Sequence, residues 1–286
     1  MPTESKPKPR GKGPRPSLWG LRSTIPAGPA RIASSVSVVV LLAAWCVASY
    51  VQVDRLGELE PLVKHSFLPA PDEVVKSLLY LFFEMDLARA IAISALRIVI
   101  AVGLSVVVAV PLGIAMGSFE IVNRIFEPVV APMRYLPITA FIPLMILWFG
   151  IGEMQKIAFL FLGTVVYLLP AVVDAVRLVP EELVQTAFTL GATRRQVITS
   201  VLIKAAMPQI FDSFRVMNAI AWTYIILAEY VNAPDGIGSV FKVAERLARP
   251  DWTFAAIAVV GVIGLLTDLL ISALNGLLFS WRETNG

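Results

Sequence analysis

Long apolar runs, separated by short polar segments, occupy most of the chain. A helix needs about 20 residues to cross the roughly 30 Å of hydrocarbon in a bilayer. The runs predict six crossings, over residues 32–51, 88–116, 121–149, 156–178, 211–231 and 252–281. We therefore expect an all-α polytopic membrane protein with both termini on the cytoplasmic side.

The third run, 121–149, differs from the others because it contains four prolines, at positions 128, 132, 137 and 143. Proline removes a helical hydrogen bond, so this helix must be kinked or broken. Irregular backbone inside a membrane is tolerated only where protein or a water-filled cavity satisfies the freed groups. We count the run as one crossing and predict that its prolines, with Arg134 and Tyr135, line a solute pathway. The alternative is a plain kink that shapes packing.

The charges of the polar segments predict the orientation in the membrane. Residues 1–31 hold seven Lys/Arg, seven prolines and one acidic residue, which predicts a disordered basic cytoplasmic tail. Residues 52–87 hold seven Asp/Glu against three Lys/Arg and therefore belong outside. Within them, LPAPDEVVKSLLYLFF predicts a helix from Asp72 that lies along the outer interface. Residues 282–286 form a cytoplasmic C-terminus.

Composition confirms the membrane class and excludes several chemistries. The 286 residues are 57% hydrophobic and 16% charged, whereas soluble domains average about 45–50% and about 25%. A single cysteine, Cys46, and a single histidine, His65, exclude an internal disulfide and a His/Cys zinc cluster. The sequence has no GxxxxGK[ST] loop and no HExxH motif. We expect no catalytic, metal or cofactor site in this chain and no nucleic-acid partner, because the basic residues concentrate in the tail.

The segment between the fourth and fifth runs is charged and amphipathic. Its first part begins with Pro180 and two glutamates, which suit the first turn of a helix, and Gly191 is a good left-handed stop. Thr193 and Gln196 match a capping box that begins a second helix, whose apolar stripe should continue until Pro208 breaks it. Such a hairpin can dock into a groove on a partner or rest on anionic lipid, and the residues alone leave both possibilities open.

Ionisable residues inside spans normally face a bundle interior or a water-filled path. Arg97 lies about ten residues into its span and is interpreted either as a pathway cation or as half of an ion pair with Asp174 or Glu229; we prefer the ion pair. Glu229 forms an outer gate or a contact for a delivery protein, or else it caps or hydrogen-bonds within the glycine-rich turn that follows it. Asp212 and Arg215 could bond to each other at i, i+3, and we prefer a structural role for them. The candidate pathway residues are Arg97, Arg134, Tyr135, Pro137 and Glu229.

An ordered set of motifs resembles the permease subunits of ABC importers. QTAFTLGATR (185–194), followed by AAMP (205–208), resembles their EAA loop. PLGIAMG (111–117), EPVVAPMRYLPITAFIPLMILWFGIGE (127–153), and Ala228-Glu229 followed by Gly236-Ile237-Gly238 resemble the nitrate/sulfonate/taurine/bicarbonate class. The match covers about residues 65–280. The chain departs from the family at Gln185 and Thr186, where Glu and Ala are usual, and at Lys204, where many members have an earlier proline.

The resemblance implies a type I importer permease with its core over 88–281 and cytoplasmic coupling helices at about 180–207. The coupling residues would be Gln185, Thr186, Ala187, Gly191, Ala192, Thr193, Arg194, Arg195, Gln196 and Val197. It also implies two ABC ATPase subunits that hold ATP and Mg, a second permease copy in a homodimer, an extracytoplasmic solute-binding protein, and a bacterial inner membrane with its lipid.

The resemblance leaves the solute less well defined than the architecture. The class implies a small oxyanion of the nitrate, sulfonate, taurine or bicarbonate type. A small organic such as a thiamine-precursor pyrimidine is the alternative. A stand-alone channel or secondary transporter is the rival from another class, although neither needs a capped cytoplasmic hairpin.

Overall fold

The computed structural model describes residues 27–55, 58–231 and 234–279, and nearly all its regular structure is helical. Most of the predicted basic tail and the predicted C-terminus lie outside the described residues. The chain forms two compact units, residues 1–71 and 72–286, which are described separately.

The first unit contains one long helix and a small hairpin. α1 (Ala27–Tyr50) includes the apolar span Arg31–Tyr50, and it is followed by the antiparallel strands β1 (Gln52–Arg55) and β2 (Glu58–Pro61). The Trp45 indole Nε1 donates to the Pro69 carbonyl at 3.0 Å, which ties the segment after the hairpin back to α1. The sequence analysis did not predict the hairpin.

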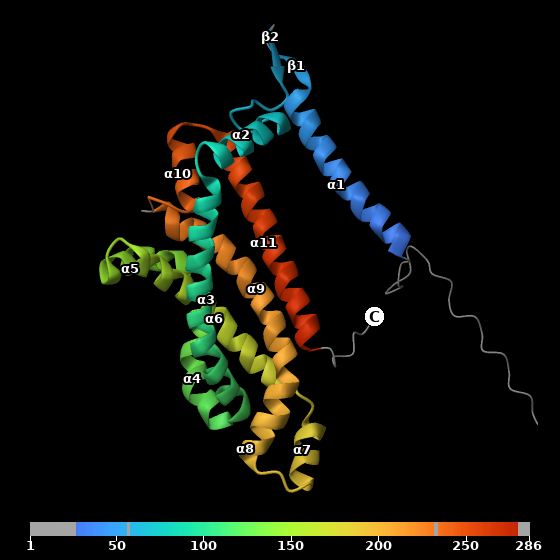
Figure 1. Cartoon of the computed structure of the whole chain (residues 1–286), viewed down its shortest axis with the longest axis vertical. Helices are drawn as coiled ribbons and strands as arrows, with labels where there is room; N and C mark the ends of the chain where they lie inside the picture. The colour runs from blue at the N-terminus through green and yellow to red at the C-terminus, as the bar shows by residue number, and fades with distance from the viewer. Residues whose placement is uncertain (1–26, 56–57, 232–233, 280–286) are drawn as a thin grey trace, which may run out of the picture. The chain divides into compact units, whose positions relative to one another are not determined.

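The second unit is a helical bundle, shown in Figure 1. Its long helices are α3 (Leu87–Ser118), α6 (Glu153–Arg177), α9 (Ile203–Tyr230) and α11 (Pro250–Leu278). Its shorter helices are α2 (Pro71–Phe83), α4 (Glu120–Met133), α5 (Ile142–Phe149), α7 (Glu181–Thr189), α8 (Arg194–Val197) and α10 (Ile237–Arg246). Among the described residues of the whole chain, five helices can span a membrane, or six if one bent pair counts as a span.

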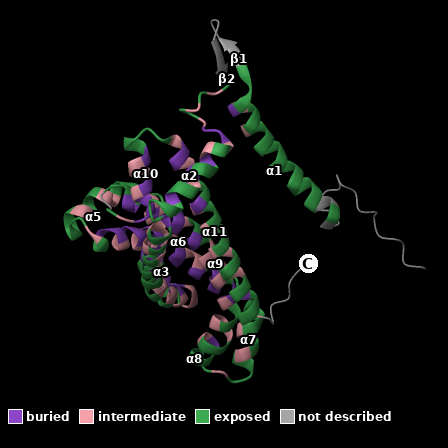
Figure 2. Ribbon diagram, turned by 45° about the horizontal axis from the view of Figure 1, so that its top comes forward, coloured by how far each residue is buried: buried purple, intermediate pink, exposed green. Residues whose placement is uncertain are grey.

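The core of the bundle lies where α3, α6 and α9 meet, as the buried residues of Figure 2 show. α3 and α6 approach closely because Gly113 and Gly117 have no side chain: a Cβ there would lie 2.7 Å from Val172 and from Val176, respectively. Small residues commonly permit such contacts between membrane helices. Ser105 and Thr164 join the same two helices by a hydroxyl–hydroxyl hydrogen bond of 2.5 Å. α3, α6 and α9 thus fill the middle of the bundle with packed side chains.

The proline-rich third run is broken, as predicted. α4 runs back beside α3, the chain turns at residues 134–137, and the 3₁₀ turn Ile138–Phe141 leads into α5 (Figure 1). The two parts are bent by 92° to each other. Pro143 lies in the first turn of α5, where its missing N–H costs little.

The prediction that Pro208 ends the second hairpin helix is wrong. α8 continues through a π-helical turn, Ile198–Leu202, into α9, which includes Pro208 in its interior. Proline is tolerated inside membrane helices where local π adjustments and neighbouring helices satisfy the freed backbone groups. Here the π turn lies just before Pro208, and the proline is buried. The result is a single run of helix, Arg194–Tyr230, of 37 residues.

α2 and the first turn of α11 meet through polar and aromatic contacts. Ser77 Oγ donates to Asp251 at 2.5 Å, and the Tyr80 and Trp252 rings stack at 5.4 Å between centroids. Arg249 donates to Asp251 at 2.6 Å, and this hydrogen bond raises the pKa of Arg249 above its ordinary value. These contacts anchor α2 to the bundle. The helix begins at Pro71, one residue before the predicted start at Asp72.

Candidate functional site

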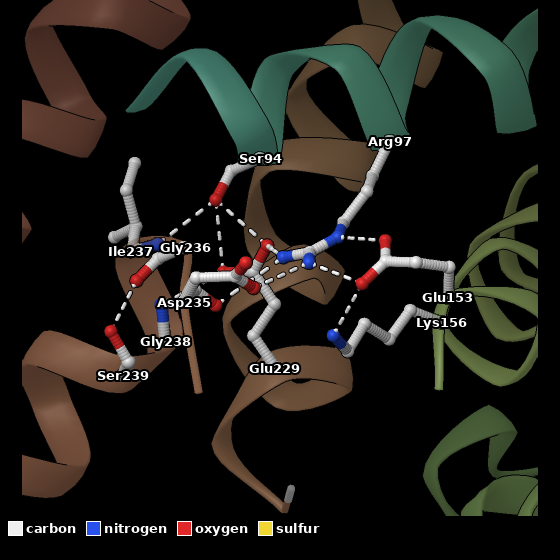
Figure 3. Close-up of polar contacts among 10 residues, drawn as sticks. All are labelled: Ser94, Arg97, Glu153, Lys156, Glu229, Asp235, Gly236, Ile237, Gly238 and Ser239. Carbon is white, nitrogen blue, oxygen red and sulfur yellow. Dashed lines mark hydrogen bonds and ion pairs between the residues drawn. The ribbon is translucent and has the colours of Figure 1, made fainter. Parts of the chain in front are cut away.

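Arg97 is the centre of a buried group of charges at the α10 end of the bundle. It lies on α3, its side chain is 3% exposed, and it binds carboxylates from three other segments (Figure 3). Glu153, the first residue of α6, accepts from Nε at 2.6 Å and from Nη2 at 2.5 Å. Glu229 on α9 accepts from Nη1 at 2.7 Å, and Asp235 accepts from Nη2 at 2.7 Å.

Glu229 is fully buried and holds the glycine-rich turn that precedes α10. Its carboxylate accepts from Ser94 Oγ at 2.7 Å and from the Gly238 backbone N–H at 2.8 Å. Ser94 Oγ in turn accepts from the Ile237 N–H at 2.9 Å. The turn thus docks its backbone donors onto one carboxylate and one hydroxyl, and the expected bond within the glycine-rich turn is found.

Two glycines make this close approach possible. Gly236 has φ +92°, and a Cβ there would lie 2.5 Å from the Glu229 carboxylate oxygens. A Cβ at Gly238 would lie 2.4 Å from the Glu229 Cβ. The motif Gly236-Ile237-Gly238 is therefore explained by the carboxylate beneath it.

The group of charges is nearly balanced. Lys156, 2% exposed, donates to Glu153 at 2.8 Å, so two cations face the carboxylates of Glu153, Glu229 and Asp235. We call these five residues, with Ser94, the α10 charge cluster. Buried charges persist only when paired and hydrogen-bonded, and the two carboxylates at the rim, Glu153 and Asp235, are 58% and 44% exposed.

The cluster decides between the two interpretations of Arg97. A guanidinium has five N–H donors, and the hydrogen bonds to Glu153, Glu229, Asp235 Oδ1 and the Asp235 carbonyl use all three of its nitrogens. The predicted ion pair with Glu229 is confirmed. In this conformation Arg97 joins α3, α6, α9 and the turn before α10, and it has no donor to offer a solute.

A second polar contact joins α9 to α11. Arg215 binds Asp268 through two hydrogen bonds of 2.8 Å each, and Asp212 accepts from Asn275 at 2.7 Å. Arg215 thus pairs with Asp268 on the neighbouring helix, a partner that the sequence analysis did not predict. The carboxylate of Asp268 on the neighbouring helix presents both oxygens to the guanidinium, a geometry that an i, i+3 neighbour does not match.

The hairpin α7–α8 lies at the opposite end of the bundle from the cluster (Figure 1). Gly191 has φ +83°, and the Ala192 N–H donates to the Ala187 carbonyl at 3.0 Å while the Gly191 N–H donates to Phe188 at 2.9 Å. These two bonds form a Schellman stop. The capping box is also present: Thr193 N donates to Gln196 Oε1 at 2.8 Å, and Gln196 N donates back to Thr193 Oγ1.

Most of the predicted coupling residues lie on the hairpin surface. Exposed side chains or backbone are found at Gln185, Thr186, Gly191, Thr193, Arg194, Arg195 and Gln196, whereas Ala187 and Ala192 are half-buried. Val197 is 2% exposed and lines a cavity of about 320 Å³ between the hairpin and the α3–α4 junction. Val197 thus positions the hairpin on the bundle and cannot itself contact a docked partner.

The remaining pathway candidates lie at the bend between α4 and α5. Arg134, Tyr135 and Pro137 are all exposed, Tyr135 by 83%. The Arg134 side chain has no hydrogen bond or ion pair to any residue that the structure describes. The structure thus separates the five candidates into two groups: Arg97 and Glu229 inside the cluster, and Arg134, Tyr135 and Pro137 on an open surface.

Several cluster members escaped the sequence analysis. Glu153, Lys156 and Asp235 were not singled out, because each is ordinary at the end of a span. The available signal was the charge of Arg97 itself, since a buried guanidinium requires carboxylates from several segments.

Comparison with known proteins places the chain among transport proteins. A family model described as binding-protein-dependent transport system inner membrane component matches residues 109–281. The taurine transport system permease protein TauC of Escherichia coli (strain K12) is 32% identical over 251 residues, covering 86% of this chain and 88% of TauC. The chain belongs to this permease family. The resemblance to ABC importer permeases of the sulfonate and taurine class is confirmed, and with it a multi-pass membrane subunit.

Two further similarities agree with this assignment. SsuC of Bacillus subtilis (strain 168), named as an aliphatic sulfonates transport permease, is 28% identical over 245 residues, covering 86% of this chain and 87% of SsuC. The inward-facing MetNI methionine ABC transporter has a chain of similar fold, with a TM-score of 0.55, 19% identity, and coverage of 65% of this chain and 95% of that one. The match to MetNI supports the fold alone.

Proposed function

We propose that this permease forms one half of an ATP-driven importer for a small oxyanion and is coupled to its ATPases through the α7–α8 hairpin. The observation that carries the proposal is the hairpin itself: a Schellman stop followed at once by a capping box fixes the angle between two short exposed helices. A hairpin resting passively on lipid would not require a rigid joint. Arg194 and Arg195 are exposed cations on the hairpin and would suit an acidic groove.

A continuous helix connects the hairpin to the α10 charge cluster. The run Arg194–Tyr230 spans 37 residues, about 55 Å at 1.5 Å per residue. Glu229, at its far end, holds the turn before α10. A displacement of α8 by a partner would therefore move the cluster end as well, which suits a two-state exchange between inward- and outward-open forms.

The pathway is proposed to lie between two identical copies. The core of the single bundle is filled by α3, α6 and α9, whereas the broken α4–α5 segment faces outward with polar residues on it. An extracytoplasmic binding protein would deliver the solute to the α10 end. The similarity to TauC and SsuC supports a sulfonate, taurine or related oxyanion.

Affinity purification of the tagged chain from its native membrane tests the coupling. We expect a stoichiometric P-loop ATPase in the wild-type complex, which is lost when Arg194 and Arg195 are both changed to Glu. The matched control is Arg124→Glu, because Arg124 is also exposed but lies on α4, where it pairs with Glu120. A stable complex without an ATPase in several mild detergents would favour the channel or secondary-transporter alternative instead.

A further inference from the structure

Three buried or half-buried cations on the helices of the bundle are neutralised by partners within the chain. Arg97 binds three carboxylates, Lys156 binds Glu153, and Arg215 binds Asp268. Each of these side chains is therefore occupied in holding helices together. Arg134 differs, because its guanidinium is exposed and pairs with nothing in the described part of the chain.

Arg134 lies between the two ends of the bundle. α4 begins two residues after α3 ends and has 14 residues, or about 21 Å of helix. Figure 1 shows α4 running back beside α3 and α5 leaving the bundle at about half its height. The bend that contains Arg134 thus lies between the hairpin end and the α10 end of the bundle.

An unpaired charge at this depth is costly in lipid. Insertion scales and simulations disagree on the size of the cost, but both place such residues against protein or water. The bend also frees backbone groups around Pro137, which hydrocarbon cannot satisfy. Arg134 and its neighbours therefore need a polar environment that the single copy does not supply.

We propose that Arg134, assisted by Tyr135, binds the anionic group of the transported solute at the α4–α5 bend. The inference rests on the proposed importer function and adds to it the residue that recognises the charge. A guanidinium matches two oxygens of a sulfonate or similar oxyanion through parallel hydrogen bonds. The Tyr135 hydroxyl, on a side chain that is 83% exposed, supplies a further donor.

Two other environments for Arg134 are alternatives that experiment can separate. The side chain can extend along the surface to a lipid headgroup, or it can pair with a carboxylate of the second copy. The lipid environment predicts no access from water. The pairing predicts weaker assembly of the two copies when Arg134 is changed, with no effect on solute affinity.

Solute uptake by the complete reconstituted importer is the first test. With taurine and methanesulfonate as probes, Arg134→Gln is expected to raise KM by about 10- to 100-fold, the range for loss of a charge-assisted hydrogen bond. Arg134→Lys keeps the charge and should lose less. Arg124→Gln, on α4, should match the wild type. Basal ATP hydrolysis should be unchanged in Arg124→Gln, and a wild-type KM in Arg134→Gln would overturn the proposal.

Cysteine labelling tests the environment of the bend without relying on uptake. Cys46 is the chain's single cysteine, so Cys46→Ser provides a background in which Tyr135→Cys is the one thiol. In permeabilised proteoliposomes we expect water-soluble methanethiosulfonates to label Tyr135→Cys. The ratio of the labelling rate of the anionic reagent to that of the cationic reagent should be about threefold higher than at Thr189→Cys on the hairpin. Adding Arg134→Gln should abolish that preference. Val107→Cys, on an exposed apolar part of α3, should stay unlabelled.

The two experiments separate failure of this inference from failure of the importer proposal. If wild-type vesicles show no ATP-dependent uptake of either probe, the proposed solute class is wrong, and labelling alone decides whether Arg134 makes the bend anion-selective. If the wild type transports and Tyr135→Cys is inaccessible, Arg134 faces lipid and the inference is wrong. Weaker assembly of the copies with unchanged KM would likewise replace solute binding by an ion pair between copies.

Discussion

Gly236 shows how a single missing side chain permits the α10 charge cluster. Its φ is +92°, and a Cβ would meet the Glu229 carboxylate at 2.5 Å. We expect Gly236→Ala to destabilise the permease by at least about 1–2 kcal/mol, the cost of left-handed backbone in an L-residue, with the clash adding to it. The thermal unfolding midpoint in detergent measures this. Gly261→Ala in α11, with no atom within 4 Å of the added Cβ, should leave the midpoint nearly unchanged.

Arg97 provides a sharper test, because its removal leaves a buried carboxylate without its cationic partner. Glu229 is 0% exposed and would lose its guanidinium, and breaking a buried pair typically costs about 3–5 kcal/mol. We expect Arg97→Met to lower the unfolding midpoint strongly and Arg97→Met combined with Glu229→Met to recover part of the loss. If the double variant is no more stable than Arg97→Met alone, the pair does not dominate the cluster.

At the same scale, sequence reasoning reached Arg97 but only part of its surroundings. A guanidinium inside a span demands a partner, and Glu229 was a natural one. Glu153 lies 56 positions away and Asp235 lies 138 away, and no local pattern relates such positions. The pairing of Arg215 with Asp268 was missed for the same reason. Helix periodicity predicts which residues are neighbours on one helix, but it does not predict contacts with another helix.

At the scale of the elements, the α7–α8 joint is where local sequence was most informative. Schellman stops and capping boxes involve residues within five positions of each other, so Gly191, Thr193 and Gln196 predicted the observed geometry. Pro208 gave the opposite result. Its usual effect on a helix was offset by the π turn before it, and nothing in the sequence signals that adjustment.

The same joint leads to a prediction about coupling. Gly191 has φ +83° and open space around it, so Gly191→Val costs backbone strain of about 1–2 kcal/mol without a clash. We expect the variant to insert and assemble but to show a lower ratio of solute uptake to ATP hydrolysis in proteoliposomes. Gly191→Asn, which tolerates left-handed backbone better, should remain closer to the wild type. Full coupling in Gly191→Val would argue against the hairpin as the transmission element.

At the scale of the whole molecule, the predicted spans correspond to helices because hydrophobic length is a direct physical requirement of the bilayer. The α1 span, α3, α6 and α11 lie within a few residues of the expected positions. α9 ends where expected but begins at Ile203, well before the predicted start at residue 211. The sequence predicted that the helix would break between α4 and α5 but not that the bend would be 92°. Proline determines where a helix is interrupted, whereas packing determines the direction of the next helix. The sequence of the β1–β2 hairpin does not alternate between apolar and polar residues, so no pattern predicted its strands.

The orientation of the bundle is the last prediction. The basic tail and the acidic residues 52–87 predict that the hairpin faces the cytoplasm and that the start of α3 faces out. Asp86 and Thr189 are both exposed and lie at opposite ends of the bundle. In a Cys46→Ser background, Asp86→Cys should react with a membrane-impermeant maleimide applied to spheroplasts, whereas Thr189→Cys should react only after permeabilisation. The reverse pattern would place the hairpin outside, where no ATPase can reach it, and would remove the physical basis for coupling.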